Sequence, residues 1–221
     1  MQQFDFSEDE LDFIERFDNR DSSYWDSDSP HMQSIKRKIK QSLLSSQNQT
    51  CCYCKMYKQE NHGAVWDVEH VFPKALYPKF TFLDKNLAVA CKECNTAKND
   101  FDVRKNKNTD SSRMRYPTTG TNINIIHPML DTYEDHIHIK RFMCGSILHA
   151  PIKGSLKGKN TFHQCNFYRF LEDTYGPNNR TESMIADRIT DQLNRINLQE
   201  LSKESIKPLV ETIVHMVCNA Q

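Results

Sequence analysis

Two pairs of cysteines have the spacing of metal ligands. Cys51 and Cys54 form one C-x-x-C pair, Cys91 and Cys94 form a second, and 36 residues separate the two pairs. In each tight turn the backbone amides can point at the sulfurs, which stabilises the thiolate charge. We therefore predict a structural Zn²⁺ held tetrahedrally by these four thiolates. Cys52 is interpreted as a bystander that could exchange with Cys51 as ligand, and a redox role lacks the surrounding βαβ pattern.

A site with four cysteine ligands is closed, so its metal fastens the chain and does not activate water. Between the two pairs stands Glu69-His70. Hydrolysis of a phosphodiester needs a base that deprotonates water and a cation that neutralises the phosphate. An imidazole suits the first task because its unperturbed pKa is about 6.5. Taken alone the pair is a weak signal, since a single histidine is more often structural.

The residues around this pair form a longer pattern, which reads Glu69-His70-Val71-Phe72-Pro73-Lys74, then Asn86-Leu87, then Cys91-x-x-Cys94-Asn95-x-x-Lys98. It resembles the HNH (ββα-metal) endonuclease family with added zinc knuckles. In that family an acidic residue or a histidine precedes the catalytic histidine, and a proline follows it three positions later. An asparagine lies beside the second strand, and an asparagine or histidine on the helix completes the site. The resemblance covers about 48 of the 221 residues.

The resemblance implies a role for each matching residue. His70 would be the general base that activates the attacking water. Glu69 and Asn95 would bind one catalytic Mg²⁺, for which Mn²⁺ can substitute, although aspartate is commoner than glutamate at the first position. Asn86 would buttress the loop that holds His70, or simply cap a turn. Lys98 would face the phosphate, or be a solvated surface lysine.

The layout is also similar to the HNH subunits of Septu-type bacterial defence systems, some of them linked to retrons. The similar features are the Cys-Cys-x-Cys knuckle, the Glu-His-x-x-Pro-Lys run and the segment Asn-Ile-Ile-His-Pro-Met-Leu-Asp at residues 124–131. That resemblance implies a role in antiphage defence with an ABC-type ATPase partner.

Charge is distributed unevenly along a chain whose formal net charge is zero. Met1 to Pro30 holds ten acidic and two basic residues, so the remainder carries a net charge of +8. No acidic residue occurs between His136 and Leu171. Cations there suit phosphate contacts, because each neutralised phosphate releases counterions. We predict nucleic-acid contacts by three lysines of this stretch, Lys153, Lys157 and Lys159.

The composition fits a protein without a membrane span, since no apolar run approaches the 18–20 residues, roughly, that a span needs. The acidic N-terminus contains no secretory apolar region, so we expect a cytoplasmic protein. Thiols stay reduced in the cytoplasm, which favours metal ligation over disulfides for the eight cysteines.

The elements that must position these residues indicate an α+β protein. We predict a zinc-stapled ββα-metal, treble-clef-like HNH core with helical additions at both ends. The predicted parts are an acidic helical segment at 1–50, the nuclease module at 51–105, and a mixed then helical region at 106–221. Expected helices begin after Ser7 and span 31–44, expected strands lie at 65–68, 86–90, 123–126 and 137–139, and further helices follow after residue 160.

Three functions remain open at this stage. The first is a metal-dependent endonuclease, with DNA favoured as substrate. The second is an HNH nuclease directed at RNA, because the chemistry does not depend on the 2′-hydroxyl. The third is a non-catalytic zinc module that binds nucleic acid or protein. The full set of Glu69, His70, Asn86 and Asn95 favours an enzyme, because a pure binder needs no base beside a metal pair.

Overall fold

The computed structural model describes residues 4–59, 65–107, 110–111, 114–141 and 147–170. These residues form two compact units. The first consists of the described residues up to Thr132 together with Gln164–Asn166, and the second of the rest. Both predicted domain boundaries, at residues 50 and 105, fall inside the first unit. None of the helices in these ranges is long and apolar enough to cross a membrane.

The first unit opens with two helices joined by a short 3-10 turn. Helix α1 spans Glu8–Glu15, the turn η1 spans Ser22–Asp26, and helix α2 spans Pro30–Ser46. Ser7 accepts a hydrogen bond from the amide of Glu10, whose carboxylate accepts one from the amide of Ser7. This capping box satisfies amides that have no partner within the helix. Helices are thus found where the sequence indicated them, after Ser7 and over most of 31–44.

A two-stranded antiparallel sheet carries the motif residues. Strand β1 spans Trp66–His70 and strand β2 spans Leu87–Cys91, with His70 opposite Leu87 and Trp66 opposite Cys91. Helix α3 follows at once at Lys92–Lys98. The chain therefore runs strand, strand, helix through the segment that contains the motif.

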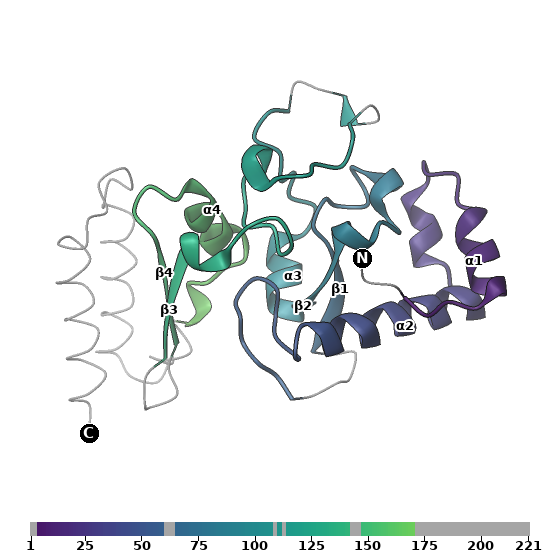
Figure 1. The fold of residues 1–221 in the computed structure, drawn as a ribbon, viewed down its shortest axis with the longest axis horizontal. Coiled ribbons are helices and arrows are strands. Elements are labelled where there is room, and N and C mark those ends of the chain that lie inside the picture. Colours follow the sequence, from purple (N-terminus) through teal and green to yellow (C-terminus); the bar gives the residue numbers. More distant parts are fainter. Residues whose placement is uncertain (1–3, 60–64, 108–109, 112–113, 142–146, 171–221) are drawn as a thin grey trace. The chain divides into compact units, whose positions relative to one another are not determined.

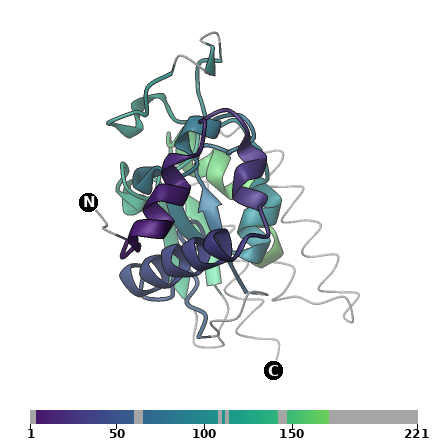
Figure 2. The ribbon, with the colours of Figure 1, turned by 90° about the vertical axis from the view of Figure 1, so that its right-hand side faces the viewer.

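Helix α2 supplies the apolar layer against this sheet. Its buried side chains recur at helical spacing, at Met32, Ile35, Ile39 and Leu43, and the helix contacts both strands. Helix α1 packs on α2, and α3 contacts the same two strands (Figures 1 and 2). All five residues of β2 are buried, as expected for a strand covered by helices.

The long connection between β1 and β2 contains two 3-10 turns, η2 at Pro78–Phe80 and η3 at Asp84–Asn86. Beyond α3 the chain forms a further 3-10 turn, η5, at Gly120–Asn122. The strand predicted at 123–126 is wrong. Ile123 makes a single β-bridge to Arg104. Ile123, Ile125 and Ile126 are buried, so burial alone accounts for the apolar residues that suggested a strand.

The second unit holds a separate antiparallel pair. The turn η6 at Tyr133–Asp135 precedes strand β3 at Ile137–Arg141, which pairs with strand β4 at Ile147–Pro151. Helix α4 spans Leu156–Gln164. The strand predicted at 137–139 is confirmed, β4 was not predicted, and α4 begins before the helices expected after residue 160. The helices expected near Thr181 and over 206–217 lie outside the described residues. The mixed α and β content is as predicted.

Candidate active site and metal centre

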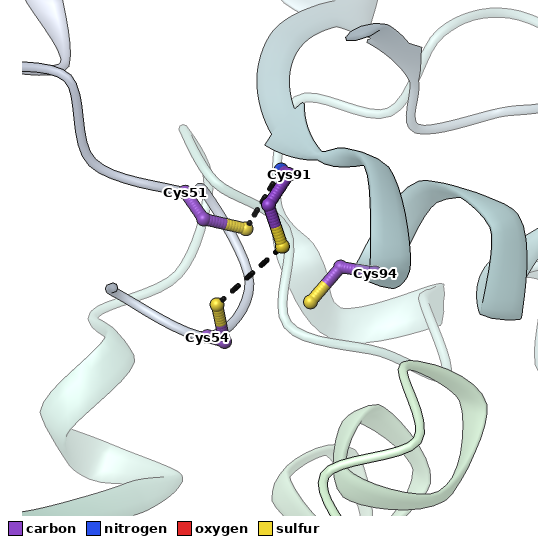
Figure 3. Close-up of side chains that lie close together, drawn as sticks. All are labelled: Cys51, Cys54, Cys91 and Cys94. Atoms are coloured by element: carbon purple, nitrogen blue, oxygen red, sulfur yellow. Dashed lines mark hydrogen bonds between the residues drawn. The ribbon is translucent and has the colours of Figure 1, made fainter. Parts of the chain in front are cut away.

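Four buried cysteines converge from three elements. Cys51 and Cys54 lie in the loop after α2, Cys91 ends β2, and Cys94 lies in α3; their sulfurs point toward one another (Figure 3). The four Sγ atoms all lie within 4.8 Å of one another, and those of Cys54 and Cys91 are 3.8 Å apart. Thiolates about 2.3 Å from a tetrahedral zinc would be separated by about 3.8 Å. The residues thus fit a zinc ion.

Two further buried cysteines lie near this cluster. Cys52 adjoins it in sequence but is not one of the four converging sulfurs, so the structure favours Cys51 as the ligand. Cys165 lies in hydrogen-bond contact with Cys94. The backbone amide of Cys91 donates to the sulfur of Cys51 over 3.3 Å, which is the kind of amide-to-thiolate contact expected in such a knuckle.

His70 ends β1 with its ring held in one tautomer. Nε2 lies 3.1 Å from the carbonyl oxygen of Thr81. A carbonyl only accepts, so Nε2 must carry the proton and Nδ1 must carry the lone pair. Nδ1 has no hydrogen-bond partner within the described part of the chain. His70 can therefore act as a base through Nδ1.

The surroundings of His70 keep it neutral. Burial lowers the pKa of His70 to about 3, although the hydrogen bond to Thr81 works in the opposite direction. The ring of Trp25, from η1, stands edge-on to the imidazole with the ring centroids 4.7 Å apart. A neutral imidazole at pH 7 is the form that can take a proton from water.

Asn86 is fully buried and braces the connection after β1. Its Nδ2 donates to the carbonyls of Phe72 and Phe80, and its Oδ1 accepts from the amide of Phe72. One side chain therefore ties both ends of the segment between His70 and its partner Thr81. These contacts are those of a buttress, the role that the family resemblance implies.

A series of hydrogen bonds through Tyr116 and His127 supports Asn86. His127 accepts at Nδ1 from the amide of Met129, so its Nε2 donates to the hydroxyl of Tyr116, 2.7 Å away. The Tyr116 hydroxyl in turn contacts the carbonyl of Lys85 and the Oδ1 of Asn86. His127, in the segment 124–131, thus belongs to the support of the Asn86 loop.

Glu69 is buried and shares one oxygen between two donors. Its Oε1 lies 2.6 Å from the ammonium of Lys98 and 2.8 Å from the hydroxyl of Tyr53. Burial raises the pKa of Glu69, against the opposite effect of Lys98. Lys98 also donates to the carbonyl of His70 and is itself buried. It does not line the cleft described below, so its position supports neither a phosphate contact nor a solvated surface lysine.

Asn95 contacts a residue that the sequence did not single out. Its Nδ2 donates to the carboxylate of Asp67 over 2.9 Å, which leaves the amide oxygen Oδ1 available as a ligand. No hydrogen bond joins Asn95 to Glu69, its predicted partner in metal binding, although both residues line the same cleft.

The cleft beside these residues has a volume of about 1440 Å³ and lies wholly in the first unit. Its walls combine the motif with α2 and η1. The motif residues Glu69, His70 and Asn95 lie at the wall together with Asp67, and the basic residues there are Lys36, Arg37, Lys40 and Lys74.

The three lysines predicted to contact nucleic acid lie in the second unit. Lys153 is exposed and Lys159 is half-buried, while Lys157 is buried in α4. The contact predicted for Lys157 is therefore not favoured by its burial, and the contacts of the other two stay predictions.

Three residues that contact the motif were not predicted from the sequence. Tyr53 stands between the first pair of cysteines, Asp67 lies two residues before Glu69 on the same strand, and Trp25 comes from an acidic loop. Only Asp67 had a usable signal, since alternate residues of a strand share a face. Nothing local connects Trp25 with a histidine 45 residues away.

Comparison with known proteins gives one partial similarity. No family model matches the chain, and no solved structure matches it. The chain is similar to the Septu protein PtuB of Bacillus thuringiensis, with 31% identity over 124 residues. These residues are 56% of this chain and 38% of that protein, so this chain spans less than two fifths of the length of the curated relative it matches.

Proposed function

We propose that this chain is a metal-dependent endonuclease of the HNH type, which hydrolyses phosphodiester bonds of nucleic acid, with DNA favoured. The observation that carries the proposal is the tautomer of His70. Its Nε2 is committed to the carbonyl of Thr81, and Nδ1 is left with its lone pair on a residue that lines a cleft with basic walls. A neutral, oriented imidazole in such a cleft is suited to deprotonate water beside a phosphate.

The order of β1, β2 and α3 supports an HNH core, because it brings Glu69, His70 and Asn95 to one cleft. Glu69 and Asn95 would hold Mg²⁺ through Oε2 and Oδ1, the oxygens without a hydrogen-bond partner among the described residues. When bound, Mg²⁺ would neutralise the scissile phosphate and the leaving oxygen. Lys98 and Tyr53 orient Glu69, and Asp67 orients Asn95.

A role in antiphage defence, with an ABC-type ATPase as partner, is part of the same proposal. It is supported by the similarity to the Septu protein PtuB and by the motifs shared with Septu-type nuclease subunits. Four thiolate ligands need a reducing compartment, which favours the cytoplasm.

The test is purified protein with Mg²⁺ or Mn²⁺ against plasmid, single-stranded DNA and RNA. We expect cleavage of DNA, and we expect His70→Ala to reduce it by about 100-fold or more, the scale of general-base catalysis. Zinc content and circular dichroism should be unchanged in this variant, because the imidazole makes no contact with the cysteines.

Two controls make the result decisive. Chelation of Mg²⁺ should stop cleavage reversibly, and His163→Ala removes a histidine of α4 that the proposal does not use. Full activity of His70→Ala would exclude the proposed base. Cleavage of RNA alone would reassign the substrate, and binding without cleavage under all conditions would favour a non-catalytic zinc module.

A further inference from the structure

Helix α2 presents two faces of different chemistry. One face is apolar and packs on the sheet. The adjacent face carries Lys36, Arg37 and Lys40, all of which line the cleft beside His70. Lys36 and Lys40 are one helical turn apart, so their side chains follow the cleft in a row.

Carboxylates lie in the surroundings of these cations, with Asp26 and Asp28 near Lys36 and Asp67 near Lys40. Within the described ranges none of the three forms an ion pair with a carboxylate. Arg37 donates to the hydroxyl of Ser34, and Lys40 donates to the carbonyl of Trp66. Lys36 stands 5.6 Å above the centroid of the Trp25 ring. By contrast, Lys38 on the far side is paired with Glu10 over 2.7 Å, and Lys74 is paired with Asp26 over 2.6 Å.

The burial of these lysines has an energetic consequence. Burial lowers the pKa of Lys36 and of Lys40. A cation that has lost part of its hydration, and has no carboxylate at ion-pair distance among the described residues, gains from an anion that enters the cleft. The anion would take the place that a protein carboxylate occupies at Lys38.

Trp25 connects this row with the catalytic residue. Its ring contacts the ammonium of Lys36 and, edge-on, the imidazole of His70. The cations therefore begin beside the histidine and continue along α2. An elongated polyanion that places one phosphate at His70 would meet them with its neighbouring phosphates.

We propose that Lys36, Arg37 and Lys40 of α2 bind the phosphate backbone of the nucleic acid next to the bond that is cut. This inference rests on the proposed function for the identity of the polyanion. It assigns substrate binding to the N-terminal helical segment, outside the residues of the motif, and to the first unit, whereas the lysines predicted from sequence lie in the second.

The test compares two triple variants with the same change of net charge. The first is Lys36→Gln, Arg37→Gln and Lys40→Gln. The matched control is Arg16→Gln, Arg20→Gln and Lys85→Gln, three exposed residues away from the cleft. Both are made in the His70→Ala background and measured without Mg²⁺, by fluorescence anisotropy of labelled DNA over a series of NaCl concentrations.

We expect the α2 triple to bind about tenfold or more weakly at 0.1 M salt, and its log–log salt slope to fall by about 2–3, because each phosphate contact contributes about 0.7–0.9. The control should keep the slope of its parent. The inference would be overturned if the salt slope of the α2 triple variant stayed at the value of the parent, or if the slope fell equally in the α2 triple variant and in the control. Cleavage assays with native His70 test the proposed function separately. If the protein cleaves DNA but the salt slope of the α2 triple variant equals that of its parent, only this inference is wrong. If the α2 triple variant weakens binding but the protein with native His70 does not cleave, only the proposed nuclease activity is wrong.

Discussion

At the scale of single residues, hydrogen bonds decide which atoms remain for chemistry. Thr81 takes the proton-bearing nitrogen of His70, Lys98 and Tyr53 take one oxygen of Glu69, and Asp67 takes the amide nitrogen of Asn95. Each contact leaves the opposite atom of the side chain without a hydrogen bond to any other described residue. The candidate site is therefore built as much by these partners as by the motif residues.

Asp67 offers the sharpest test of this arrangement. We expect Asp67→Ala to weaken the activating affinity for Mg²⁺ by about 10–100-fold, the usual cost of losing a group that orients a metal ligand. The maximal rate at saturating Mg²⁺ should fall much less. The measurement is cleavage as a function of Mg²⁺ concentration, which separates affinity from rate.

Two companion variants isolate the hydrogen bond to Asn95. Asp67→Asn keeps an acceptor and should restore most of the Mg²⁺ affinity. Lys92→Ala removes only the exposed ion pair that Asp67 also makes, at 3.3 Å, and should change little because such pairs contribute about 0–1 kcal/mol. A loss of rate at every Mg²⁺ concentration in Asp67→Ala would point instead to a structural role.

At the scale of elements, the attachment of α1 to α2 depends on one buried carboxylate. Glu10 accepts from the amide of Ser7 and from the ammonium of Lys38. Burial alone would raise the pKa of Glu10, but the hydrogen bonds outweigh it and lower the pKa from 4.5 to about 2. Because α2 also lines the cleft, this contact helps to fix the wall that carries Lys36 and Arg37.

The lowered pKa gives the stability a defined dependence on pH. A carboxyl whose pKa is lower in the folded state stabilises the fold above its unfolded pKa, and this contribution is lost as pH falls from about 4.5 to about 2. Glu10→Gln should cost about 1.5–3 kcal/mol at pH 7, the range for hydrogen bonds to charged groups. Urea unfolding at pH 7 and at pH 3 measures the effect.

The difference between the wild-type protein and Glu10→Gln should shrink at the lower pH, because the carboxyl of Glu10 is then protonated in the unfolded chain and must lose that proton on folding. Glu8→Gln is the control, since Glu8 is exposed in the first turn of the same helix. An equal difference at both pH values would mean that the charge of Glu10 is not what holds α1.

At the scale of the whole molecule, the four cysteines join segments that are distant in sequence. They connect the loop after α2 with the end of β2 and the start of α3. Tyr53, between the first two cysteines, reaches Glu69 on β1. A metal bound there would therefore stabilise the fold and, through Tyr53, the candidate active site.

We expect Cys91→Ser to lose bound zinc and to cost about 4 kcal/mol or more, as is usual when a structural metal is lost. Cys52→Ser should retain one zinc per chain, because Cys52 is outside the converging set. Zinc is measured by atomic absorption and stability by thermal unfolding. If Cys91→Ser retains zinc and Cys52→Ser loses it, then Cys52 and not Cys91 is the ligand.

Local patterns in the sequence predicted several helices and strands of the fold. Ser7 with its acidic first turn predicted α1, the spacing of Met32, Ile35 and Ile39 predicted α2, and β-forming runs predicted β1 and β2. These signals depend on neighbours a few residues apart. The apolar run at 123–126 led to the prediction of a strand that does not form. Buried residues outside a sheet can have the same apolar pattern as a strand. Helix α4 begins four residues before the point, residue 160, after which the sequence indicated helices.

What the sequence by itself determined is the chemistry available: four thiolates at metal-ligand spacing, a histidine beside a carboxylate, and the asparagines that follow. Only the tertiary structure decided which atoms of these groups stay unengaged and what surrounds them. It buried Lys98 under Glu69, turned Asn95 toward Asp67, and brought Trp25 and the cations of α2 to His70. The physical reason is that residue types and short-range spacing are written along the chain, whereas hydrogen-bond partners, burial and local charge arise from packing between segments far apart in sequence.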